Sequence, residues 1–389
     1  MVDGINPTGT TARILVGTQS VQRSIHSLWA ASLAGCRPTI TSEQAVPASH
    51  PITEHCLRTA EHTQFYLACG PEAGPLLIFV HGWPELAWSW RHQLPAFAAL
   101  GFRAIAPDMR GYGRSSHYKQ LSDYAQEHVV GDMLRLLAAL GRTRAVWVGH
   151  DWGSPTVWNI AAHHPEHCQA VASLCVPYYG LERGLDAVLP LIDRQMYPEA
   201  EFPVGQWDYM RYYEESFPAA VAAMEANIDN AVRLLFRKGS PDAVGQPAGT
   251  AFTRQSGGWF GGASEPPSLP RDDDVLSEED AARYTAALTS SGFVGPDAYY
   301  MNHARNAEYA RSVVNDGVLD MPVLFLHARY DTVCETLVSD LAKPMRAKCR
   351  NLQEAIVDTG HWMAQEKPRE VNAHLLRWLA TQVPEVWPV

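Results

Sequence analysis

The chain has 389 residues, 46% hydrophobic and 10% aromatic, enough for one large domain or for a core that carries a sizeable insertion. The net charge of −11 and the lack of any run of Lys or Arg argue against nucleic acid as a partner. The seven cysteines are odd in number and include no C-x-x-C pair, which indicates buried thiols in a reducing compartment. The sequence contains no H-E-x-x-H motif, and we expect neither a metal nor a cofactor.

The N-terminal residues 1–52 are rich in Thr, Ser and Gly, and we expect them to form an extension outside the main fold. Within this extension, residues 33–36 (Leu-Ala-Gly-Cys) have the form of a lipoprotein cleavage box. His26 interrupts the preceding apolar stretch, which is also short for an export signal. We therefore expect a cytoplasmic protein, monomeric or homodimeric, with export as the alternative. No run approaches the roughly 18 apolar residues of a membrane span.

Short apolar runs alternate with helical patterns along most of the remaining chain. The expected strands are residues 64–69, 76–80, 102–106, 145–148, 170–176, 322–326 and 351–357. The expected helices are residues 88–100, 123–140, 154–162 and 368–380. Strands that alternate with helices in this way are typical of a doubly wound, mostly parallel sheet of the α/β class.

Residues 177–320 break this alternation. They contain helical patterns at 217–236 and 277–289 but no clear buried strand. Residues 238–270 are rich in Gly, Pro, Ser and Ala and are expected to form a long irregular loop, which is usually functional or mobile. We therefore expect a core in two parts, 53–176 and 321–389, separated by an inserted, mainly helical cap.

A strand, a sharp turn and a helix are expected around residues 149–153, which read Gly-His-Asp-Trp-Gly. The glycines allow the tight turn of a G-x-S-x-G nucleophile elbow, which exposes the central side chain above the sheet. Here that side chain is Asp151 rather than Ser. A carboxylate that attacks an ester only forms an anhydride, whereas attack on a strained or activated sp3 carbon gives an alkyl-enzyme ester that water can hydrolyse. The alternative is that Asp151 caps the following helix.

Two further residues complete the order nucleophile, acid, histidine along the chain. Asp331 follows one expected strand and His361 follows the last one. Because ligands bind beyond the carboxyl ends of the strands in open parallel sheets, we expect Asp331 and His361 to meet Asp151 there. Taken singly, Asp331 reads as the cap of a helix over 335–342 and His361 as an ordinary loop residue. The other position for the acid, residues 175–179, offers no carboxylate.

The turn at residues 80–84 (Val-His-Gly-Trp-Pro) lies where such a fold builds half of an oxyanion hole from backbone N–H groups. Donors are needed there because a tetrahedral anion forms when water attacks the enzyme ester. We assign this role to the N–H groups of Trp83 and Trp152. His81 and His150 are interpreted as structural side chains rather than as bases.

Four segments together resemble the α/β-hydrolase-fold epoxide hydrolases. They are residues 80–85, 108–113, 149–153 and 360–368. The resemblance extends from about Phe65 to Trp378 and implies an α/β-hydrolase fold with a helical cap. It also implies a cofactor-independent enzyme that converts a small-molecule epoxide to a vicinal diol. In that family two cap tyrosines hold the epoxide oxygen and protonate the departing alkoxide, and by register these roles fall to Tyr209 and Tyr300.

Several alternatives stay open at this point. Tyr209 stands in a run with Tyr212 and Tyr213, where packing alone is the other interpretation. Haloalkane dehalogenases share the Asp nucleophile but typically carry Asn where this chain has Trp83, and fluoroacetate dehalogenases carry Arg where Trp152 stands. A non-catalytic ligand receptor on the same scaffold is a further alternative. A serine esterase is excluded because no G-x-S-x-G follows a strand.

Overall fold

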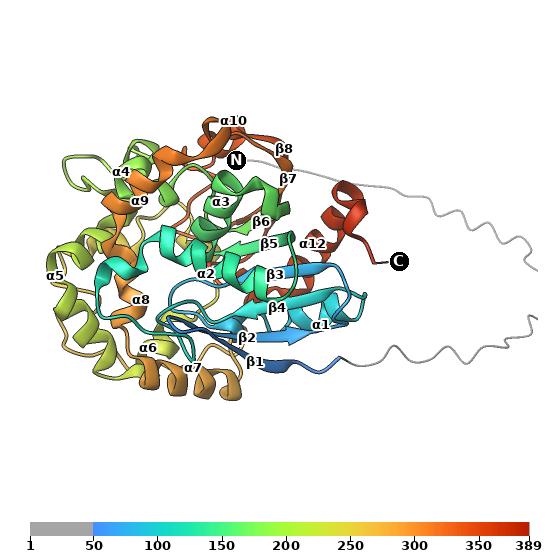
Figure 1. Cartoon of the computed structure of the whole chain (residues 1–389). Coiled ribbons are helices and arrows are strands. Elements are labelled where there is room, and N and C mark those ends of the chain that lie inside the picture. The colour runs from blue at the N-terminus through green and yellow to red at the C-terminus, as the bar shows by residue number, and fades with distance from the viewer. Residues whose placement is uncertain (1–49, 389) are drawn as a thin grey trace, which may run out of the picture. The chain divides into compact units, whose positions relative to one another are not determined.

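An eight-stranded sheet organises residues 50–388, the part of the chain that this computed structural model describes (Figure 1). The strands are β1 (Thr53–Arg58), β2 (Thr63–Cys69), β3 (Leu76–Val80), β4 (Arg103–Pro107), β5 (Ala145–His150), β6 (Cys168–Leu174), β7 (Leu319–Ala328) and β8 (Cys349–Val357). Their order across the sheet is β1-β2-β4-β3-β5-β6-β7-β8. The β1–β2 and β2–β4 pairs are antiparallel and the other five are parallel. The predicted mostly parallel, doubly wound sheet is confirmed.

The central strands are buried on both faces because helices cover the sheet. Every residue of β3 and β5 is buried, as expected of apolar strands in a parallel sheet. The core helices are α1 (Gln93–Ala98), α2 (Gln126–Ala139), α3 (Gly153–His163), α10 (Lys343–Lys348), α11 (Met363–Glu366) and α12 (Pro368–Gln382). Strand β1 was missed in the sequence because its side chains are mostly exposed at the sheet edge and show no apolar alternation.

Three helices expected from the sequence differ in the structure: one is shorter, one is divided in two and one does not form. The helix expected over 88–100 is a 3-10 turn (Ala87–Trp90) followed by α1, whose third residue is a proline that cannot donate an N–H to a longer helix. The helix expected over 217–236 is two helices, because α5 ends at Glu225 and the side chain of Asn227 caps the start of α6. Residues 335–342 form turns rather than the helix that the capping interpretation of Asp331 required.

The described residues between β6 and β7 contain helices, 3-10 turns and loops but no strand. The helices are α4 (Leu185–Val188), α5 (Asp208–Glu225), α6 (Ile228–Leu235), α7 (Glu278–Ser291), α8 (Val294–Ala298) and α9 (His303–Tyr309). Figure 1 shows α5, α6, α7 and α8 gathered at the left of the view. Residues 238–270 form an irregular loop with two short 3-10 turns. We take these segments as the cap expected over 177–320.

The extension 1–52 and the segment 33–36 lie outside the described residues, apart from the last few positions of the extension. Within residues 50–388, no helix combines the length and apolar content needed to cross a membrane.

Candidate active site

The sharp turn between β5 and α3 places Asp151 above the sheet. Asp151 has φ of 48°, a left-handed conformation that residues other than glycine rarely adopt. The turn leaves no room for side chains on its glycines, since a Cβ on Gly149 would lie 2.6 Å from the carbonyl oxygen of Gly153. Helix α3 has no side-chain cap, and the Asp151 carboxylate accepts a hydrogen bond from Trp83 instead. The geometry therefore does not support the helix-cap interpretation of Asp151.

The loops after β7 and β8 bring Asp331 and His361 to this turn. His361 Nδ1 lies 2.7 Å from Asp331 Oδ2, and His361 Nε2 lies 3.4 Å from Asp151 Oδ2. The other oxygen of Asp331 accepts two backbone hydrogen bonds, from the N–H groups of Val333 and Cys334, both at 2.9 Å. Asp331 is thus held by three contacts, and it orients the ring of His361 toward Asp151.

The charges around His361 determine its protonation. Burial alone would lower the pKa of His361, but the Asp331 carboxylate and the hydrogen bond to Asp151 outweigh burial and raise this pKa well above its ordinary value. Burial would raise the pKa of Asp331, yet His361 and the two backbone N–H groups lower it. Asp331 and Asp151 thus favour the protonated form of His361 in the free protein.

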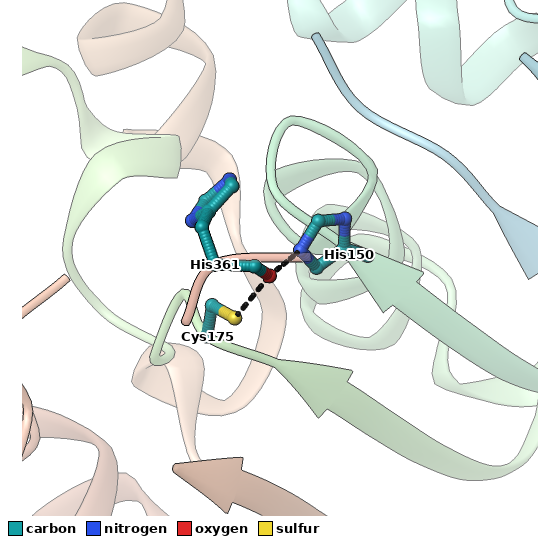
Figure 2. A group of neighbouring side chains, drawn as sticks. All are labelled: His150, Cys175 and His361. Atoms are coloured by element: carbon teal, nitrogen blue, oxygen red, sulfur yellow. Dashed lines mark hydrogen bonds between the residues drawn. The ribbon is translucent and has the colours of Figure 1, made fainter. Parts of the chain in front are cut away.

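Two buried side chains hold the backbone of the His361 loop. The Nε2–H of His150 donates to the carbonyl oxygen of His361 at 2.8 Å, and the thiol of Cys175 lies 3.3 Å from the same oxygen (Figure 2). Burial alone would lower the pKa of His150, but the Glu85 carboxylate at 2.6 Å raises it to about 10. The rings of His150 and His361 lie side by side, with centroids 4.8 Å apart. Through the shared carbonyl oxygen, His150 and Cys175 thus support the loop that carries His361.

The turn after β3 supplies a backbone donor to the nucleophile. The N–H of Trp83 lies 2.6 Å from Asp151 Oδ1. A Cβ on Gly82 would collide with the Asp151 carboxylate and would lie 2.5 Å from the Trp152 nitrogen. The Asp151 carboxylate and the Trp152 nitrogen therefore both lie next to Gly82. His81 accepts from the Met109 N–H at 2.9 Å through Nε2, and its other nitrogen lies 2.8 Å from the Gly82 oxygen. Burial lowers the pKa of His81 to about 4, so this neutral ring supports the turn rather than acting as a base.

The two cap tyrosines face the nucleophile from above. Tyr209 lies in the first turn of α5, and Tyr300 lies in a 3-10 turn (Tyr299–Met301) after α8. Both rings are buried, and their centroids are 5.5 Å apart. Both residues line a cavity of about 350 Å³ together with Asp151 and His361. Neither tyrosine hydroxyl has a hydrogen-bond partner among residues 50–388.

Burial raises the pKa of Tyr209 well above its ordinary value, and the nearby Asp151 carboxylate adds to the shift. Burial does the same for Tyr300, with Tyr209 and Asp151 contributing. Both phenols are therefore protonated proton donors. Of the three tyrosines at 209, 212 and 213, only Tyr209 lines the cavity.

Comparison with known proteins decides the family. Residues 75–368 match the alpha/beta hydrolase fold family. The chain is 34% identical to epoxide hydrolase A of Mycobacterium tuberculosis over 315 residues, which cover 80% of this chain and 92% of that protein. The crystal structure of epoxide hydrolase A from Mycobacterium thermoresistibile superposes with a TM-score of 0.69 at 30% identity, covering 85% of this chain and 99% of that one.

The chain belongs to the α/β-hydrolase-fold epoxide hydrolases. The predicted fold and family are thereby confirmed. The chain is also 36% identical to bifunctional epoxide hydrolase 2 of Sus scrofa over 310 residues, or 79% of this chain, but it spans only about half (52%) of the length of that relative.

The site of this epoxide hydrolase family member contains residues that the sequence reasoning missed. Trp259, from the Gly-rich loop, stacks on Trp83 with ring centroids 5.8 Å apart, and it lies 5.4 Å from the ring of Tyr209. Asp297 is buried behind the tyrosines and accepts a hydrogen bond from Trp83. The available signals were a single Trp in a run of glycines and a lone carboxylate in the apolar stretch 293–301. Neither signal indicates a partner, because the partners lie far away along the chain.

Proposed function

We propose that this protein hydrolyses an epoxide to a vicinal diol through an alkyl-enzyme ester on Asp151. The observation that carries the proposal is the single cavity shared by the Asp151 carboxylate, the His361 ring and the unpartnered hydroxyls of Tyr209 and Tyr300. A carboxylate opposite two phenolic donors can open a strained ring from the back while the oxygen is protonated.

In the first step, an Asp151 oxygen attacks one carbon of the epoxide. An alkoxide is a poor leaving group, so the hydroxyls of Tyr209 and Tyr300 bind the ring oxygen and supply its proton. The Trp83 N–H holds Asp151 Oδ1 and so restricts the carboxylate to one orientation. The product of this step is a hydroxyalkyl ester of Asp151.

In the second step, His361 takes a proton from water, which attacks the ester carbonyl. Once Asp151 is an ester, it no longer offers the hydrogen bond that helps to raise the pKa of His361. The imidazolium returns its proton to the tyrosinate left by ring opening, and the neutral ring can then act as a base. Asp331 stabilises the imidazolium that forms. The backbone N–H groups of Trp83 and Trp152 bind the tetrahedral oxyanion, and its collapse releases the diol.

A single turnover in water enriched in heavy oxygen tests the covalent route. With protein in excess over styrene oxide, the first diol should carry light oxygen drawn from the Asp151 carboxylate, and the label should enter the protein. Mass spectrometry of the diol and of the peptide with Asp151 measures both. Heavy oxygen in the first diol would mean that water attacks the epoxide directly, and the proposal would be wrong.

Two substitutions separate the two steps. His361→Gln should leave the ester unhydrolysed, so that the protein gains the mass of one epoxide molecule. Asp151→Asn should abolish turnover until slow deamidation restores the carboxylate. Intact-protein mass spectrometry after incubation with styrene oxide distinguishes these outcomes, and an unmodified His361→Gln protein would contradict the covalent mechanism.

A further inference from the structure

A buried carboxyl in the cap joins three segments that surround the reacting groups. Asp297 on α8 has no exposed surface. Its Oδ1 accepts from the indole N–H of Trp83 at 2.8 Å and from the hydroxyl of Tyr213 at 3.1 Å, and its Oδ2 has no partner among the described residues. One oxygen therefore connects the turn after β3, helix α5 and helix α8.

Each partner of Asp297 touches a residue that takes part in the proposed chemistry. The backbone N–H of Trp83 lies 2.6 Å from Asp151 Oδ1. The ring of Tyr213 stacks on the ring of Tyr300, with centroids 4.7 Å apart and planes at 4°. A shift of Trp83 would therefore move the donor to the nucleophile, and a shift of Tyr213 would move the surface on which Tyr300 rests.

Burial favours the neutral form of the Asp297 carboxyl. Burial raises its pKa to about 8, and the negative charge of Glu225 adds to this, while the hydrogen bonds from Trp83 and Tyr213 act in the opposite sense. A neutral carboxyl still accepts both hydrogen bonds.

We propose that Asp297 is a positioning residue for ring opening: it holds Trp83 and Tyr213 so that the backbone donor to Asp151 and the hydroxyl of Tyr300 keep their places around the epoxide. The inference rests on the proposed function, and it adds to the site a residue that does not line the cavity. Asp297 acts through other residues and touches no reacting atom.

The test compares Asp297→Leu, which has a similar shape but no acceptor, with Asp297→Asn, which keeps an acceptor oxygen. Styrene oxide is mixed with excess protein, and rapid-quench mass spectrometry follows the formation and the loss of the alkyl-enzyme. Asp297→Leu should slow alkylation about 10- to 100-fold, as a small misplacement of reacting groups does. Asp297→Asn should restore alkylation to within about threefold of the wild type, because the hydrogen bonds remain.

A second indole–carboxylate contact between core and cap provides a matched control. The indole N–H of Trp88 donates to Asp280 Oδ1 at 2.6 Å, and neither residue lines the cavity. Trp83→Phe should slow alkylation, whereas Trp88→Phe should leave it unchanged. Tyr213→Phe, which keeps the stacked ring but loses the hydroxyl, should also slow alkylation. If Asp297→Leu does not fold, Trp83→Phe and Tyr213→Phe test the inference in its place.

Unchanged alkylation in Asp297→Leu would overturn the inference while leaving the proposed function intact. Equal slowing in Asp297→Leu and Asp297→Asn would overturn it as well, since the acceptor oxygen would then be irrelevant. A wild-type protein that forms no alkyl-enzyme would overturn the proposed function and the inference together.

Discussion

At the scale of single residues, the hydroxyls of Tyr209 and Tyr300 are polar groups left without a partner in a mostly apolar cavity. Because neither hydroxyl is committed to another described residue, both are free to donate to an epoxide oxygen in the cavity. Nearby tyrosines are arranged differently, since Tyr213 donates to Asp297 and Tyr299 donates to the carbonyl oxygen of Arg110.

Replacing Tyr300 with phenylalanine should slow alkylation by about 10²-fold or more, because the developing alkoxide loses a proton donor. The same change at Tyr209 should also slow alkylation. Tyr212→Phe, from the same tyrosine run but outside the cavity, is the matched control and should leave it unchanged. Stopped-flow single turnovers with styrene oxide measure the rate constants. An undiminished rate of alkylation by styrene oxide in Tyr300→Phe would show that Tyr300 does not supply the proton. A halide needs no proton donor, so undiminished turnover of a haloalkane by the same variant would favour a dehalogenase.

At the scale of elements, the long loop of the cap is joined to the loop that carries His361. Gly239 and Gly360 meet backbone to backbone, since a Cβ on Gly360 would lie 2.5 Å from the nitrogen of Gly239. Both N–H groups donate to Glu366 Oε2, at 3.1 and 2.9 Å respectively. The Glu366 side chain therefore holds the cap loop at Gly239 against the loop that carries His361.

An alanine at position 239 should force these two loops apart, because its Cβ would collide with the backbone of Gly360. We expect a loss of about 1–3 kcal/mol in the free energy of unfolding, as for other overpacked sites, together with slower ester hydrolysis. Gly249→Ala is the matched control, since no atom lies within 4 Å of a Cβ there. Urea unfolding and single-turnover kinetics check both effects, and equal behaviour of the two variants would contradict this account.

At the scale of the whole molecule, several buried groups keep protons that the unfolded chain releases. Burial raises the pKa of Asp297 and that of Glu335 to about 8 each. Burial would lower the pKa of His150, but Glu85 raises it to about 10. Each of these folded-state values lies above the unfolded one, so each of these three groups binds more protons in the folded protein than in the unfolded chain. The stability contributed by these groups is therefore lost as the pH rises from 6.5 to 8.5, while the buried His81, whose pKa burial lowers to about 4, acts in the opposite sense near pH 6.5.

The contribution of Asp297 to the pH dependence of stability can be measured separately. A single extra proton in the folded state changes the free energy of unfolding by about 1.4 kcal/mol per pH unit. Asp297→Asn removes this proton, so the fall in stability between pH 6.5 and 8 should become shallower by about that amount. Asp186→Asn, on an exposed residue, should leave the slope as in the wild type. Urea unfolding at pH 6.5, 7.25 and 8 measures the slopes, and equal slopes for wild type and Asp297→Asn would show that Asp297 ionises normally.

Local patterns were enough to predict most of the sheet and the candidate nucleophile, acid and base. Buried strands of a parallel sheet are short apolar runs, and the glycines around Asp151 are required by the turn itself, so both signals lie in neighbouring residues. The sequence predicts Asp331 and His361 for the same reason, since each follows a strand of this type. Strand β1 and the break at Asn227 were missed, because an exposed edge strand and a side-chain cap leave only weak local patterns.

The surroundings of the site were decided by the tertiary structure. The contacts of Asp297 with Trp83 and Tyr213 join residues 214 and 84 positions apart, and the Trp83–Trp259 stack joins residues from the core and the cap. No periodicity encodes such contacts, because they depend on how the cap folds back over the carboxyl ends of the strands. By itself, the sequence determined which residues bear the proposed chemistry. Only the packing of the cap on the sheet decided which side chains hold them in place, since that packing brings distant residues to one cavity.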